Sequence, residues 1–271
     1  MERLLIAKHN ENNVVEVKND LTFNYVLVDC AKLPAVFTIE VNENVTTDIL
    51  VINPKNNEIT LNLNYGSNVK FSILAIGEVS NMNITANLKN NAELQGFLAD
   101  FITNNAKVSM CANLLESYST CNWHLASVAS KDDRKELDVS VYHFASNTFA
   151  RMDNYGVCKD EAKLTFSGIS KIENGAYDSK THQNAKIMVF DEKSTGIAKP
   201  ILKIDENSIE ASHAAVVGKI NDEHLFYLVS RGLSEAEAKE LITLGYLKPI
   251  LKGFQDEEVA EQISNLIEER M

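Results

Sequence analysis

The sequence predicts a mostly β chain followed by a small all-helical domain, and two observations carry this prediction. From about residue 36 to 172, short segments of alternating apolar and polar residues follow one another, with asparagine between them. Asparagine occurs 29 times, and 27 of these lie at or before Asn207, so the chain changes character near residue 215. Alternation every second residue is typical of half-buried strands, whereas the apolar residues after this point are spaced as on one face of a helix. We therefore predict a β domain over residues 1–218 and a helical domain over residues 219–271.

The predicted strands follow each other at short, regular intervals. Ile59, Leu61 and Leu63 lie two residues apart and form one apolar face, because side chains alternate between the two sides of a strand. Each of six such segments opens on an asparagine, and these asparagines are 10 to 14 residues apart. The segments are residues 44–52, 57–65, 68–76, 81–88, 91–101 and 105–115.

Regularly spaced strands are typical of a sandwich or a barrel, but two features favour a solenoid here. Asparagine tolerates the left-handed backbone conformation and bonds its own backbone, which suits a corner repeated at every turn of a coil. Antiparallel hairpins would need more Asn-Gly turns than the single pair Asn174–Gly175. The pattern therefore favours a parallel β-helix with one shared core, and it leaves open a β-sandwich of asparagine-rich composition.

The helical domain is predicted from its start and stop signals. A first helix begins at Asn221 or Asp222 and ends at Arg231–Gly232, since acids favour the N-terminal end and glycine the position after the helix. Ser234 and Glu237 form a capping box that opens a second helix through Leu244, with Gly245 as its stop. Pro249 lies in the first turn of a third, short helix, and Asp256 caps a last one.

The first two of these helices are too short to be stable alone in water. We therefore expect them to pack together and against the end of the β-helix, closing an otherwise open stack of strands. In this arrangement Leu225, Leu228 and Leu241 face inward.

Composition excludes several classes of function. With 26 basic and 38 acidic residues the net charge is −12, which argues against binding to nucleic acid and to anionic membranes. No stretch of about 18 apolar residues and no signal-peptide core is present, so we expect no membrane span and a cytoplasmic protein. Four scattered cysteines form no disulfide framework, which agrees with a reduced compartment.

The usual catalytic motifs are missing from the chain. It has no G-x-G-x-x-G or G-x-x-x-x-G-K-[ST] loop for a nucleotide, no G-x-S-x-G elbow, no H-E-x-x-H and no C-x-x-C pair. We therefore predict that the protein is not an enzyme and that the isolated chain holds no tightly bound cofactor.

Four linked blocks in the second half resemble the SufB/SufD family of iron–sulfur cluster assembly proteins. The most specific is SHAAVVGKINDEHLFYLVSRG at residues 212–232, which is similar to the family's S-H-G-A-T-V-G followed by D-E-x-x-L-F-Y-L-x-S-R-G. The others are VYHFASNT at 141–148, FSGISKIENGAYDSKTHQN at 166–184 and PILKIDENSIEASH at 200–213. Four of the six histidines lie in these blocks, and two of them, His143 and His213, stand where the family's patterns themselves have a histidine.

The resemblance implies a right-handed parallel β-helix with a C-terminal helical domain. It also implies a scaffold subunit of a SUF-type complex, in which SufB and SufD pair through their β-helices and each binds the ABC-type ATPase SufC through its helical domain. The complex builds an iron–sulfur cluster, which lies transiently at the subunit interface, and passes it to apo-proteins. The partner β-helix is then a SufB-like paralogue or a second copy of this chain.

This chain departs from the family pattern in ways that bear on the cluster. Strands begin almost at once, so it resembles a short form without the family's N-terminal helical region. Ala214 follows His213 where SufB carries a glutamate, and Ala211 replaces the cysteine of SufD. Thiolate is the ligand that iron–sulfur clusters need most. The chain is therefore closer to SufD than to SufB, and His213 is left as the candidate metal ligand, since imidazole suits iron.

The resemblance places the ATPase-binding surface on the helical tail. We predict that its partner-binding residues are Phe226, Tyr227, Arg231, Leu244 and Leu247, an outward group of the kind that marks an interface.

Two further functions stay open at this point. One is a self-sufficient, SufB-like homodimeric scaffold. The other is a polysaccharide-binding or polysaccharide-acting β-helix protein, since that fold hosts pectin-active enzymes.

Overall fold

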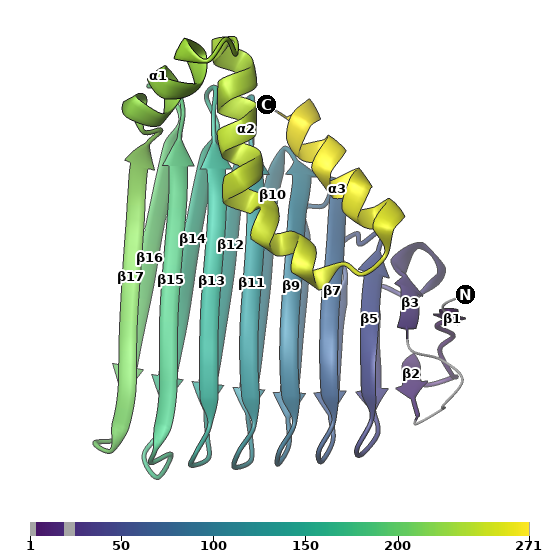
Figure 1. The fold of residues 1–271 in the computed structure, drawn as a ribbon. Coiled ribbons are helices and arrows are strands. Elements are labelled where there is room, and N and C mark those ends of the chain that lie inside the picture. The colour runs from purple at the N-terminus through teal and green to yellow at the C-terminus, as the bar shows by residue number, and fades with distance from the viewer. Residues whose placement is uncertain (1–3, 19–24, 271) are drawn as a thin grey trace.

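The computed structural model describes residues 4–18 and 25–270, which form a parallel β-helix with helices along one side (Figure 1). Each strand pairs with the strand two positions further along the chain, so the odd-numbered strands form one sheet and the even-numbered strands another. Every strand pairing among the described residues is parallel. The predicted β-helix is therefore confirmed, and the alternative of an antiparallel sandwich is wrong.

The two sheets, here called sheet A and sheet B, face each other along the solenoid, with sheet B behind sheet A in Figure 1. Sheet A contains β1 (Leu4–Ile6), β3 (Tyr25–Asp29), β5 (Thr46–Ile52), β7 (Asn68–Glu78), β9 (Glu93–Thr103), β11 (Thr120–Ala129), β13 (Phe149–Cys158), β15 (Ser179–Val189) and β17 (Ile209–Lys219). Sheet B contains β2 (Val14–Val17), β4 (Val36–Val41), β6 (Glu58–Leu63), β8 (Asn81–Leu88), β10 (Asn105–Leu114), β12 (Arg134–His143), β14 (Lys163–Ile172) and β16 (Thr195–Ile204). The six segments read from the sequence correspond to β5 through β10.

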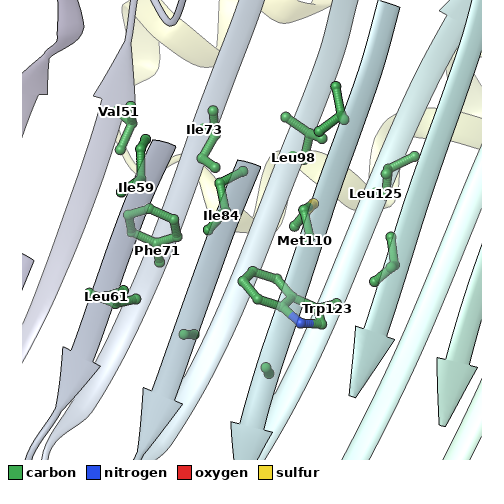
Figure 2. Close-up of a cluster of buried hydrophobic side chains, with 14 of the residues drawn as sticks. Val51, Ile59, Leu61, Phe71, Ile73, Ile84, Leu98, Met110, Trp123 and Leu125 are labelled. Atoms are coloured by element: carbon green, nitrogen blue, oxygen red, sulfur yellow. The ribbon is translucent and has the colours of Figure 1, made fainter. Parts of the chain in front are cut away.

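The core lies between the two sheets. Ile59, Leu61 and Leu63 point inward and are fully buried, as their alternation predicts. Figure 2 shows how such side chains from successive turns stack on one another, with Phe71 and Trp123 as the largest members. Because each turn buries its apolar row against the turns before and after it, the core is continuous along the solenoid.

Asparagine supplies most of the tight corners, as the sequence predicts. Ten described non-glycine residues have a positive φ, and six of them are asparagine. One column of such corner residues, with one member in each successive turn, leads from the even-numbered strands into the odd-numbered ones. Its members are Asn44, Gly66, Asn91, Tyr118, Asn147 and Asp178. Asparagine dominates because its short amide side chain tolerates the left-handed conformation.

The tail forms α1 (Asp222–Ser230), α2 (Glu235–Leu247) and α3 (Glu257–Glu269) where the sequence predicts helices, with a 3₁₀ segment η2 (Lys248–Gly253) before the last. The predicted end of the second helix at Leu244, with Gly245 as its stop, is wrong, because α2 continues through Gly245 to Leu247. Asn221 caps α1 and Asp256 caps α3 through their side-chain oxygens. Ser234 and Glu237 make the reciprocal capping box of α2. These caps satisfy backbone N–H groups that a helix leaves unpaired at its start.

The tail does not close the end of the solenoid, so that expectation is wrong. Figure 1 shows α2 and α3 lying across the outer face of sheet A. Ile250 and Phe254, together with Ile263 of α3, join a second apolar cluster with Phe97 and Phe101 of β9. The outward positions of sheet A here are apolar and need a cover, and this decides where the helices pack. Leu241, expected to face inward, is 50% exposed.

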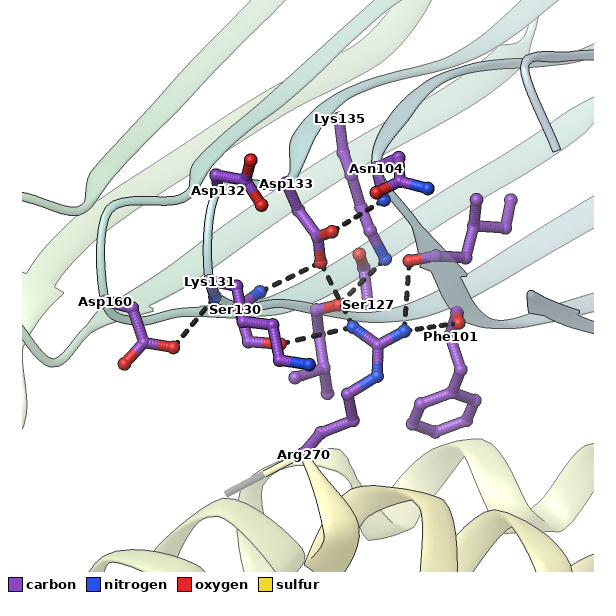
Figure 3. Close-up of polar contacts among 12 residues, drawn as sticks. Phe101, Asn104, Ser127, Ser130, Lys131, Asp132, Asp133, Lys135, Asp160 and Arg270 are labelled. Carbon is purple, nitrogen blue, oxygen red and sulfur yellow. Dashed lines mark hydrogen bonds and ion pairs between the residues drawn. The ribbon is translucent and has the colours of Figure 1, made fainter. Parts of the chain in front are cut away.

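Polar contacts fasten Arg270, the residue after α3, to the corners of the solenoid (Figure 3). The Arg270 guanidinium donates to the Phe101 carbonyl at 2.8 Å and the Asp133 carboxylate at 3.1 Å. Inside the corner, Lys135 Nζ lies 2.9 Å from Asp100 Oδ2, and both side chains are fully buried. Burial lowers the pKa of Lys135, while the Asp100 carboxylate opposes that shift. Two opposite charges therefore compensate each other in the buried interior, where the Ser127 hydroxyl also donates to Asp100 at 2.6 Å.

Candidate functional site

The C-terminal end of the solenoid is open. Sheet A ends at β17 and sheet B ends at β16, and no described strand pairs with the outer edge of either. Val216 and Val217 of β17 are 55% and 44% exposed, and Ile201 of β16 is also exposed. A long, uncovered edge with apolar side chains offers unpaired backbone donors and acceptors to another strand. We call the edges of β16 and β17, with the side chains that face the interior there, the open end.

His213 lies in the middle of β17, on the row that faces the interior. It pairs in register with Gln183 of β15, which pairs with Met152 of β13, and that row continues through Trp123. Its predecessors in the row are buried, whereas His213 is exposed because no further turn covers it. The imidazole is therefore accessible at the open end, where a second subunit or a metal ion could reach it.

The interior beneath His213 is polar, unlike the apolar core of the earlier turns. Gln183 Nε2 donates to Ser170 Oγ at 2.8 Å and to the Ile201 carbonyl at 3.0 Å. Thr181 donates to the same Ser170 hydroxyl at 2.8 Å. The buried Asn154 Oδ1 in the turn below has no hydrogen-bond partner in the described structure. This polar cluster could have been recognised in the sequence, because its residues stand at positions that the alternation of side chains places on the inward face of their strands.

His143 has a different environment from His213. It faces the interior of β12, fully buried, between Leu114 and Ile172 in the register of sheet B. Its Nδ1 lies 2.7 Å from Thr148 Oγ1, which explains why a histidine and a threonine stand five residues apart in this block. Burial lowers its pKa to about 4, so it is neutral at physiological pH. His143 thus stabilises the turn and is not accessible to a ligand.

The four cysteines are free thiols. Cys30, Cys121 and Cys158 are buried, and Cys111 is half-buried on the outer side of sheet B. Burial raises the pKa of Cys111 to about 11 and that of Cys30 to about 12, which disfavours thiolate. Among the described residues, no group of three or more histidine, cysteine or acidic side chains is placed to hold a metal ion.

A second exposed group lies on α1, the first helix after the open end. Phe226 is 74% and Tyr227 is 57% exposed, and the Arg231 guanidinium stacks over the Tyr227 ring at 5.2 Å from its centroid. These three predicted partner-binding residues are therefore grouped on the surface. Exposed aromatic side chains beside an arginine have the composition of protein interfaces.

The other two predicted partner-binding residues lie elsewhere. Leu247 is only 1% exposed and belongs to the apolar cluster between the tail and sheet A, so the expectation that it faces outward is wrong. Leu244 is half-buried and packs against the same cluster. Both residues face sheet A because α2 lies along its outer face instead of over the end of the solenoid.

The fold and these two exposed groups define a class of protein: a parallel β-helix that is open at its C-terminal end and carries a helical tail along one sheet. The family model for the SUF system FeS cluster assembly, SufBD core domain, matches residues 14–246. The chain belongs to this SufB/SufD family.

Relatives with curated descriptions agree with this membership. The chain is 35% identical over 144 residues to the iron-sulfur cluster assembly protein SufD of Bacillus subtilis, covering 53% of this chain and 33% of that protein. It is 31% identical over 135 residues to SufB of the same species, covering 50% of this chain and 29% of that protein. An iron-sulfur cluster assembly SufBD family protein of Staphylococcus epidermidis is 30% identical over 133 residues, with 49% and 29% covered. The matches thus span about a third of the length of these relatives.

The helices of the described chain are all too short or too polar to cross a bilayer.

Proposed function

We propose that this protein is a scaffold subunit of a SUF-type iron–sulfur cluster assembly complex, which pairs with a second β-helix subunit and docks an ABC-type ATPase. The exposed edge of β17 carries the proposal. None of the described strands pairs with the outer edge of its eleven residues, and Val216 and Val217 are uncovered. Pairing with an equivalent strand would satisfy the backbone groups and bury both valines.

The proposal gives His213 a role at the junction of the two subunits. A histidine on the inward row of the last strand would lie between the two interiors once a second β-helix is joined there. The cluster is the cargo of such a complex, and thiolates for it would come largely from the partner, since the cysteines of this chain are buried or half-buried. His213 would contribute one imidazole ligand or orient the cluster.

The exposed group on α1 is the proposed contact with the ATPase. Phe226 and Tyr227 lie on α1, Arg231 directly follows it, and only two residues separate α1 from β17. An ATPase bound there would therefore sit beside the open end. The chain itself supplies no phosphate-binding loop, so nucleotide hydrolysis belongs to the partner in this proposal, and the chain acts without catalysis of its own.

The test is reconstitution of the complex. The chain, a SufB-like paralogue and a SufC-like ATPase are co-expressed, purified together and supplied with iron and sulfide under anaerobic conditions. We expect a stable three-component complex with visible absorbance, whereas the isolated chain stays colourless. Ala215→Pro, which places an imino acid within the edge strand, should abolish pairing with the paralogue. Retention of the complex by this variant would contradict pairing through β17.

One outcome of this experiment would favour the alternative function, a self-sufficient homodimeric scaffold, over pairing with a paralogue. If the isolated chain dimerises through β17 and develops a chromophore alone, then the second subunit is a copy of the same chain. Membership of the SufB/SufD family favours either scaffold over a polysaccharide-acting protein.

A further inference from the structure

None of the α-helices in the described chain packs on the outer face of sheet B, and the charges of this face are segregated along the solenoid. At the N-terminal end, β2, β4 and β6 contain no basic residue, and their outward side chains include three carboxylates. These are Glu16, Glu40 and Glu58. At the open end, β14 and β16 point lysines outward and contain no acidic residue; these are Lys163, Lys171, Lys199 and Lys203. A chain with a net charge of −12 thus carries a local basic surface beside its open end.

Most of these lysines are free of salt bridges. Lys171 lies 2.6 Å from Glu173 and is neutralised by it. Across the part of the chain that the structure describes, no carboxylate lies within 4 Å of the amines of Lys163, Lys199 or Lys203. Lys199 and Lys203 flank the exposed Ile201 on β16. The surface therefore combines uncompensated positive charge with an apolar centre.

A hollow of about 450 Å³ lies at the start of the same strands. Lys107, Arg134 and Lys163 line it from three neighbouring strands, against a single carboxylate from Glu136. The Arg134 guanidinium is held in place there, because its Nη1 donates to the Glu161 carbonyl at 2.7 Å. The hollow can accept an acidic side chain or two, while a longer segment continues along β14 and β16.

We infer that this surface, formed by the outward side chains of β14 and β16 and the adjoining hollow, docks an acidic segment of a partner protein. Because the rest of the chain carries excess negative charge, it repels such a segment, and the electrostatic field of the protein guides the segment to this one face. Ile197 and Ile201 supply apolar contact between the lysines, as the centre of a protein interface requires. A nucleic acid is a poorer match, since a long polyanion would meet the acidic remainder of the surface.

This inference goes beyond the proposed function and does not need it to hold, because it concerns a face of the single chain. If the open end does pair with another subunit, the docked segment would lie beside that junction. A visiting acidic protein would then be held next to the place where a cluster is assembled.

The experiment uses the full chain and fluorescein-labelled poly-L-glutamate, with binding followed by fluorescence anisotropy at low and physiological salt. The variant Lys199→Glu/Lys203→Glu reverses two charges on the surface. The control Lys55→Glu/Lys248→Glu reverses two exposed lysines elsewhere and changes the net charge equally. We expect wild-type binding that weakens with salt, at least a tenfold loss in the surface variant and less than a threefold loss in the control. Circular dichroism verifies that both variants are folded.

Three results would overturn the inference: no binding of poly-L-glutamate by the wild type, equal losses in the two variants, or a loss confined to the control. A labelled oligothymidylate of matched charge gives the remaining comparison. If it binds as tightly as poly-L-glutamate and loses affinity in the same surface variant, the surface is a general polyanion site and the assignment to an acidic protein is wrong.

Discussion

Arg270 Nη1 lies 3.1 Å from Oδ2 of Asp133, although 137 residues separate the two in the chain. Asp133 also accepts hydrogen bonds from the backbone N–H groups of Asn104 and Ser130. One carboxylate therefore joins the corners of two turns to the end of α3. The tail is held on sheet A by this polar contact as well as by the apolar cluster beneath it.

Arg270→Ala should destabilise the docked tail. The variant leaves the Asp133 carboxylate, which is 5% exposed, without its cationic partner, at a cost of about 2–3 kcal/mol. Urea unfolding measures this change, and hydrogen exchange should increase first in α3. Arg231→Ala serves as the control, because this exposed arginine should change stability by less than about 0.5 kcal/mol. Equal stability of the two variants would show that the contact contributes nothing.

Stability should fall below neutral pH because of His143. Its pKa is about 4 in the folded chain against 6.5 ordinarily, so its contribution is complete above pH 6.5 and is lost as the pH falls toward 4. Between pH 7 and 5 the loss is about 2 kcal/mol. His143→Leu, which fits between Leu114 and Ile172, should lack this part of the pH dependence in urea unfolding. His224→Leu, at an exposed position, should keep the wild-type profile.

Gly96→Ala should disturb the core more than its size suggests. A Cβ at Gly96 would overlap the ring of Trp123, which occupies the next turn of the same inward row. Overpacking of this kind costs about 3 kcal/mol, measured by thermal or urea unfolding. In a Trp123→Leu background the ring is absent, so Gly96→Ala should there cost less stability than it costs in the wild type. A Cβ added at Gly245 in α2 would contact no other atom, so Gly245→Ala should instead stabilise the helix by about 0.5–1 kcal/mol.

His213→Ala should lower the yield of cluster on the reconstituted complex without unfolding the chain. The side chain is exposed and has no packing role within the single subunit, so urea unfolding of the variant should match the wild type within about 0.5 kcal/mol. The yield is read from visible absorbance after anaerobic reconstitution. An unchanged yield would limit His213 to a structural role at the junction.

Phe226→Ala/Tyr227→Ala should weaken binding of the ATPase at least tenfold in a pull-down or by calorimetry. Point variants are preferable to deletion of residues 219–271, because deletion would also uncover Phe97, Phe101 and other apolar residues of sheet A. The matched control is Val36→Ala/Tyr177→Ala, which removes two exposed side chains far from α1. If both double variants bind the ATPase like the wild type, the docking surface lies elsewhere.

The strands, their inward rows and the helix starts could be predicted because each depends on neighbours in sequence. The end of α2 could not, because the helix continues through Gly245. Alternation identifies the buried Ile59, Leu61 and Leu63, and the capping box at Ser234 and Glu237 fixes the start of α2. The SHAAVVG block likewise indicates that His213 belongs to a functional segment. Whether the strands stack as a solenoid or a sandwich could not be decided by the pattern, because both bury alternate residues, and the family resemblance decided it.

The sequence by itself determined the local elements, the family and the candidate ligand. Only the tertiary structure decided where the tail packs, that Leu247 is buried while Phe226 stays exposed, and that His213 stands uncovered at the open end. It also revealed the pairing of Lys135 with Asp100 and the basic face of β14 and β16. The physical reason is that these features depend on contacts between residues one or more turns apart. A local period records which side of a strand a residue occupies, but not which distant segment covers that side.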